Sequence, residues 1–218
     1  MKSRWLGPAA ALVLGFGVWQ LAGGGYLFLK AQLAQVLLER SWRLERVGAA
    51  DARPWPWADT RALMRLRVPR LGVEQIVLAG ASNRTLAFGP GFLLASQPPG
   101  RPGVTAISGH RETHFSFLGQ LRPGDLVELE TPDGRRHGYR VEGSRVVDVR
   151  QSRLRLASDR DELVLITCYP LNALGPLGPQ RYLVYAAAEE TAARSAPGTL
   201  HPQRIHAATG GPIPEPKP

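Results

Sequence analysis

Residues 163–170 have the sequence Leu-Val-Leu-Ile-Thr-Cys-Tyr-Pro, an apolar and largely β-branched run that ends at the only cysteine of this 218-residue chain. A run of this length and composition predicts a buried strand. Pro170 has no amide hydrogen with which to extend a strand, so the strand is expected to end or kink there. The thiol of Cys168 then lies at the end of a rigid element, where a loop can expose a nucleophile. The alternative is a small buried side chain, because free cysteines are among the most buried residues.

Two other segments favour the nucleophile. His110 follows a short apolar run in the sequence Ala-Ile-Ser-Gly-His, and Arg181 opens the apolar segment 180–186. A cysteine nucleophile needs a partner that forms or stabilises its thiolate. Acyl transfer also needs a hydrogen-bond donor directed at the developing oxyanion. The sequence therefore predicts Cys168, His110 and Arg181 as the catalytic residues.

The three segments resemble the catalytic segments of the sortase family. The family pattern at the cysteine is Thr-Leu-x-Thr-Cys, and residues 164–168 match it except that Val164 replaces the first threonine. The family histidine lies in a Gly-His-Arg sequence, as it does at 109–111. The family arginine opens the strand after the cysteine loop, where Arg181 stands.

The likeness extends over roughly residues 60–189, and the long segment Tyr169–Gln180 is similar to that of the Gram-negative sortases called class GN. The resemblance implies a cysteine transpeptidase with an eight-stranded β-barrel. It implies that Cys168 attacks an LPxTG-like sorting signal at the C-terminus of a partner protein. A thioester would form and pass to an amine acceptor, with His110 acting first as acid and then as base. No cofactor is implied.

The apolar pattern independently predicts a mainly-β domain over 60–190. About eight short strands with little helix favour a closed or nearly closed barrel, which leaves no long bare edge. A hairpin signal surrounds Pro132-Asp133-Gly134. The tail 191–218 is rich in proline and glycine and is predicted to be disordered, because it has too little apolar surface to fold alone.

The N-terminus predicts a membrane anchor over 1–30 and a stalk or linker over 31–59. Trp5 to Leu29 contains no charged residue, and this length suffices for a transmembrane helix. Lys2 and Arg4 favour a cytoplasmic N-terminus. The domain is then expected on the periplasmic side of the cytoplasmic (inner) membrane, held by a single pass. The alternative is a cleaved signal peptide. The helical pattern over 31–47 predicts either a stalk or a helix packed on the domain.

Composition narrows the remaining functions. One cysteine excludes an intramolecular disulfide. The net charge of +9 is scattered, without a nucleic-acid motif, so no nucleic-acid partner is expected. His110 and His114 are four residues apart but have no obvious third ligand, so no metal is expected. Two alternatives to a transpeptidase stay open: a membrane-anchored barrel that binds a peptide or glycan without catalysis, and a hydrolytic cysteine peptidase.

Overall fold

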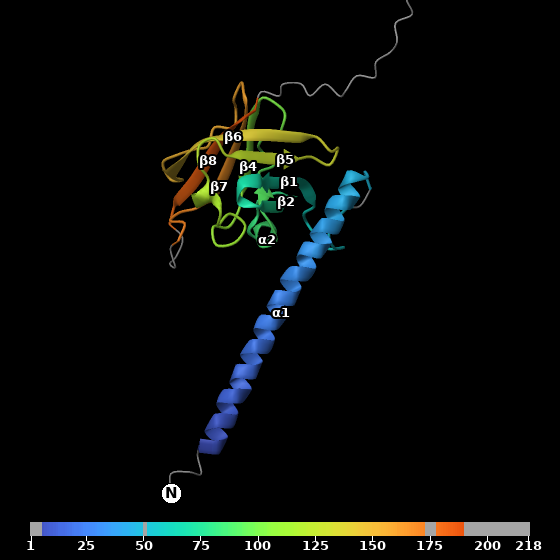
Figure 1. The fold of residues 1–218 in the computed structure, drawn as a ribbon, viewed down its shortest axis with the longest axis vertical. Coiled ribbons are helices and arrows are strands. Elements are labelled where there is room, and N and C mark those ends of the chain that lie inside the picture. The colour runs from blue at the N-terminus through green and yellow to red at the C-terminus, as the bar shows by residue number, and fades with distance from the viewer. Residues whose placement is uncertain (1–5, 50–51, 173–177, 190–218) are drawn as a thin grey trace, which may run out of the picture.

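The computed structural model describes residues 6–49, 52–172 and 178–189. Within these residues, a β-barrel is joined to one long N-terminal helix that projects away from it (Figure 1). The tail predicted over 191–218 lies outside the described residues, as do the first five residues of the predicted anchor.

The described part of the chain contains eight strands, which close into a barrel in the order β1-β2-β3-β4-β7-β8-β6-β5. This confirms the mainly-β, eight-stranded barrel. The strands are β1 (Ala62–Val68), β2 (Val73–Ala79), β3 (Gly91–Phe92), β4 (Gly103–Ser108), β5 (Leu126–Glu130), β6 (Arg136–Asp148), β7 (Asp161–Cys168) and β8 (Gln180–Ala188).

Strand pairing brings distant parts of the sequence together. The pairs β2–β3 and β4–β7 are parallel, and the other pairs are antiparallel. β7, the strand that carries Cys168, lies between β4 and β8. The barrel therefore sets the segments that hold His110, Cys168 and Arg181 on three adjacent strands.

Local signals explain the short connections. The 3₁₀ turn η1 (Pro69–Leu71) joins β1 to β2 and is closed by Gly72, whose φ of 62° lies in the left-handed region that glycine tolerates. Helix α2 (Asn83–Leu86) is one turn long, and the hydroxyl of Ser82 caps it by accepting a hydrogen bond from the Thr85 amide at 3.1 Å. A second 3₁₀ turn, η2 (Leu118–Gln120), precedes β5.

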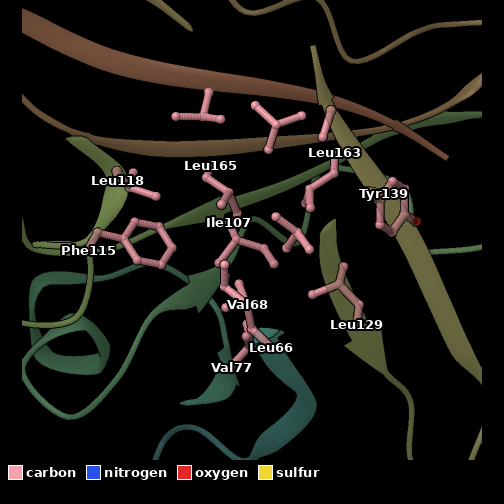
Figure 2. Close-up of a cluster of buried hydrophobic side chains, with 14 of the residues drawn as sticks. Leu66, Val68, Val77, Ile107, Phe115, Leu118, Leu129, Tyr139, Leu163 and Leu165 are labelled. Atoms are coloured by element: carbon pink, nitrogen blue, oxygen red, sulfur yellow. The ribbon is translucent and has the colours of Figure 1, made fainter. Parts of the chain in front are cut away.

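The inside of the barrel is filled with apolar side chains from most of its strands. Leu163 and Leu165 of β7 point inward and are almost fully buried, beside Ile107 of β4 (Figure 2). Successive side chains of a strand point to opposite faces. Val164, Ile166 and Cys168 therefore point outward, which leaves the thiol on the outer face of a rigid strand.

Helix α1 (Leu6–Arg46) is continuous over 41 residues. Its C-terminal part packs on the barrel, where Leu38 and Trp42 are buried against Ala62, Ile76 and Leu78. The Arg65 guanidinium lies 5.6 Å from the centre of the Trp42 ring and donates to Glu39 at 2.7 Å. Of the two alternatives for residues 31–47, the structure shows the helix packed on the domain.

The predicted anchor over 1–30 overlaps the start of α1. In the described residues, no helix combines the length and the apolar character that crossing a membrane requires.

A bidentate ion pair fixes the entry to β5. Arg70 donates through Nε and Nη2 to the two carboxylate oxygens of Asp125, both at 2.6 Å, and the Arg122 amide donates to Oδ2 at 2.7 Å. The Asp125 side chain is 8% exposed. The hydrogen bonds from Arg70 lower the pKa of Asp125 below its ordinary 3.8.

We expect Asp125→Asn to lower the free energy of unfolding by about 2 kcal/mol at pH 7, since charge-assisted hydrogen bonds to a buried carboxylate are lost. A lowered folded-state pKa contributes stability above the unfolded-state pKa, and this stability is lost as pH falls through the folded-state value. The difference between variant and wild type should therefore shrink below about pH 4 in urea unfolding. Asp59→Asn, which alters an exposed ion pair with Arg84, is the control and should change stability by less than about 0.5 kcal/mol. If both substitutions lowered the free energy of unfolding equally, the stabilising role of the Arg70–Asp125 ion pair would be contradicted.

Candidate active site

Cys168 and Arg181 lie directly opposite each other. Cys168 is the last residue of β7, is half-buried, and is paired with Arg181 in the antiparallel register with β8. The preceding pairs on the same face are Ile166 with Leu183 and Val164 with Tyr185. Because opposite residues of an antiparallel pair project to the same face, the thiol and the guanidinium end one continuous row of outward side chains.

The His110 segment continues β4 beside the end of β7. Ser108 is level with Ile166 in the parallel register, and the Gly109 amide donates to the Ile166 carbonyl at 3.0 Å. The buried hydroxyl of Thr167 donates to the Gly109 carbonyl at 2.7 Å. His110 therefore follows at the level of Cys168, on the opposite side from Arg181.

Gly109 is required by packing. A Cβ at this position would lie 2.8 Å from the ring of Phe115, which is fully buried. The glycine lets the backbone pass over that ring and leaves His110 at the rim. This close approach is a physical reason for the Gly-His sequence.

Arg111 ties the histidine segment to the loop after the cysteine. Its side chain is 4% exposed, and its Nη1 donates to the Pro170 carbonyl at 2.6 Å while its Nε donates to Glu112 at 2.6 Å. Sequence reasoning missed this role. An arginine beside a candidate catalytic histidine carries no signal that distinguishes a buried brace from a surface charge.

Arg181 is held at the rim by its own loop. Its Nη1 donates to the carbonyls of Gly178 at 2.9 Å and Gln180 at 2.8 Å. The side chain also lines a cleft of about 1220 Å³ on the outer face of β4, β7 and β8. Arg181 thus lies opposite Cys168 in the strand register and borders this cleft.

This cleft, called here the large cleft, has an apolar floor of Val104, Val164 and Leu183. Its wall is the segment 149–160 between β6 and β7, whose Leu154 and Leu156 pack against that floor. Arg153, Arg155, Asp159 and Glu162 add charges to the lining. Val104, Val164 and Leu183 are almost fully buried under this wall. An extended peptide in the large cleft would therefore lie mainly against the wall, with Arg181 at the end nearest the thiol.

A second cleft, called here the small cleft, has a volume of about 490 Å³ and is bordered by His110. It is lined by Ala34, Gln35, Ala87, Phe88, His110, Glu112, Thr113 and His114. Burial, together with the nearby His110, lowers the pKa of His114 below its ordinary 6.5. No set of three or more metal-ligating side chains occurs in the parts of the chain that the structure describes.

A half-buried thiol at a strand end, with an arginine opposite and a histidine segment beside it, is the arrangement expected of a cysteine-dependent acyl-transfer site. Residues 66–189, more than half of the chain, match the sortase domain. The chain therefore belongs to the sortase family, whose members are cysteine transpeptidases.

Individual relatives agree with this assignment. Sortase D of Bacillus subtilis (strain 168) is 32% identical over 121 residues, which cover 55% of this chain and 60% of that protein. Sortase C-1 from Actinomyces oris is 28% identical with a TM-score of 0.51, over 58% of this chain and 71% of that chain. The chain thus spans less than two thirds of the Bacillus relative.

Two further solved structures share the fold. Sortase A from Corynebacterium diphtheriae has a TM-score of 0.55 at 24% identity, over 63% of this chain and 65% of that one. Sortase C of Clostridium perfringens, solved with the C-terminal cell wall sorting motif, has a TM-score of 0.53 at 20% identity. It covers 74% of this chain and 90% of that one.

Proposed function

We propose that this protein cleaves an LPxTG-like sorting signal of a partner protein through a thioester on Cys168 and transfers the acyl group to an amine. The observation that carries this proposal is the register that pairs Cys168 with Arg181 at the end of the large cleft. The proposal assigns catalytic roles to Cys168, His110 and Arg181.

In the first half of the reaction, the Cys168 thiolate attacks the peptide carbonyl, and Arg181 donates hydrogen bonds to the oxyanion. His110 protonates the departing amine as the C–N bond breaks, which leaves the acyl group as a thioester. In the second half, an incoming amine attacks the thioester and His110 takes its proton. One imidazole that acts as acid and then as base is regenerated in each cycle.

The large cleft supports a peptide donor. The large cleft runs over the outward face of β4, β7 and β8 and borders Arg181, so a peptide held in it would bring one carbonyl to the thiol of Cys168 opposite. Within the family, the long Tyr169–Gln180 segment supports placement with the class GN sortases.

We further propose that the N-terminal segment holds the protein at the cytoplasmic membrane, with the barrel on the periplasmic side. The support is in the sequence: Lys2 and Arg4 precede the uncharged stretch from Trp5 to Leu29. Fractionation of cells, followed by labelling of Cys168 with a membrane-impermeant maleimide, tests it. Recovery in the soluble fraction, or labelling only after lysis, would reject it.

We expect the full chain, incubated with an LPxTG-type peptide and excess amine, to show a transient mass increase on Cys168 and then an amine-capped product. Intact-mass analysis and product chromatography measure the two species. A thioester followed only by hydrolysed peptide would indicate the cysteine peptidase instead. No mass increase, with Cys168 resistant to alkylation, would indicate the non-catalytic binding module.

A further inference from the structure

The two clefts have no lining residue in common and border different candidate catalytic residues. Across the strands β4, β7 and β8 the order is His110, Cys168 and Arg181. The large cleft borders Arg181, whereas the small cleft borders His110. A donor peptide in the large cleft therefore leaves the small cleft open on the side from which a second substrate reaches both the imidazole and the thioester.

The charge in the small cleft suits a cation. Glu112 is 57% exposed, and the hydrogen bond from Arg111 lowers its pKa below the ordinary value, so the carboxylate is ionised at neutral pH. Arg111 itself is buried behind it. Both oxygens of a carboxylate accept hydrogen bonds, so Glu112 can bind a second donor beside Arg111. The lowered pKa of His114 keeps that imidazole neutral near pH 7, so it adds no repelling charge.

The remaining walls of the small cleft are largely apolar and come from two distant elements. Ala34 belongs to α1, and Ala87 and Phe88 follow α2. The Gln35 amide donates to the Phe88 carbonyl at 3.1 Å, and the Phe88 ring lies edge-on to Trp55 at 4.8 Å. These contacts fix one wall of the cleft. A volume of about 490 Å³ is in the usual range for small-molecule sites.

We propose that the small cleft is the acceptor site, and that it selects a primary ammonium on an apolar stem, the chemistry of a lysine side chain. Glu112 attracts the ammonium, and Ala34, Ala87 and Phe88 pack against the stem. This inference rests on the proposed function, because it gives that reaction its second substrate and places it.

The bound ammonium loses one proton to solvent and becomes a neutral amine beside His110. Its lone pair attacks the thioester carbonyl, and the nitrogen gives its second proton to the neutral imidazole. The C–S bond breaks with its electron pair on sulfur. The products are the amide, the Cys168 thiolate and the His110 imidazolium, which are the reactants for the next donor.

The test compares two amines at saturating donor peptide with the full-length chain. Nα-acetyl-lysine methylamide is a cation on an apolar stem, and hydroxylamine is uncharged at neutral pH. We expect Glu112→Gln to raise the KM for the lysine derivative about five- to tenfold, because a partly exposed charge-assisted contact is lost. The KM for hydroxylamine should change less than about twofold. Thr113→Glu, at an exposed position of the same cleft, should lower the KM for the lysine derivative about threefold.

The matched control is Glu142→Gln, which removes a carboxylate of similar exposure that pairs with Arg160 on the barrel wall. It should change neither KM. Glu112→Gln could shift the KM values of both amines equally, or both Glu112→Gln and Thr113→Glu could leave the KM for the lysine derivative unchanged. Either result would overturn the acceptor site. Thioester formation without amine is measured first by intact mass. Its absence in the wild type overturns the proposed function and this inference together, whereas a thioester with unaltered amine selection overturns the acceptor site alone.

Discussion

Cys168→Ala is expected to lower the rate of sorting-signal cleavage by about a thousandfold or more, because the variant has no nucleophile to form the thioester. The Cys168 side chain is half-buried at the end of β7. The side chains of β7 that pack inside the barrel are the alternate residues Leu163 and Leu165. The thermal unfolding midpoint should therefore stay within a few degrees of the wild type. Peptide cleavage is measured by chromatography, and unfolding by circular dichroism.

Cys168→Ser is the companion variant, since it replaces the thiol with a hydroxyl of similar size that is a far weaker nucleophile near neutral pH. It should retain donor peptide binding and be nearly as inactive as Cys168→Ala. A Cys168→Ala protein that still cleaves the peptide at the wild-type rate would end the catalytic proposal.

Arg181→Ala is expected to lower kcat about 10²- to 10³-fold, the usual effect of removing one oxyanion donor. The residue lies opposite the thiol, and its guanidinium is held by the carbonyls of Gly178 and Gln180. If Arg181 acts on the oxyanion, the loss should fall mainly on thioester formation, with a smaller change in KM for the peptide. Single-turnover measurement of the mass increase on Cys168 gives the rate of thioester formation separately from the KM for the peptide.

The matched control is Arg135→Ala. Arg135 is an exposed residue in the turn before β6, whereas Arg181 pairs with Val147 near the other end of that strand. It should leave turnover unchanged. A large KM effect with normal thioester formation in Arg181→Ala would assign the arginine to peptide binding instead of oxyanion stabilisation.

Strand positions could be predicted from the sequence because they depend on local patterns of apolar and turn-forming residues. The apolar run that ends at Cys168 is β7 as predicted, and the hairpin predicted around Pro132-Asp133-Gly134 joins β5 to β6. The packing of α1 on β1 and β2 was left open. It depends on whether Leu38 and Trp42 find an apolar surface, and that surface is built by strands later in the chain.

The candidate site was predictable in its residue types and less so in its surroundings. The residue patterns identify Cys168, His110 and Arg181, whose roles stay predictions until the variants are measured. The parallel pairing of β4 with β7 joins segments about sixty residues apart, and no periodicity within either segment indicates it. The wall of the large cleft over 149–160 forms no regular strand or helix in the structure, so its place over the β-sheet follows from tertiary packing alone.

The continuity of α1 also determines where the barrel can work. A helix of 41 residues is roughly 60 Å long, and Gln35, at the small cleft, lies about 40 Å along it from Leu6. A flexible tether of equal length would let the barrel sample a wide volume. A helix packed onto the barrel through Leu38 and Trp42 acts instead as a strut. With the far end of α1 held at the membrane as proposed above, this strut would set the distance at which both substrates reach the thiol. Length alone would then select partner proteins by how far their sorting signal lies from the membrane.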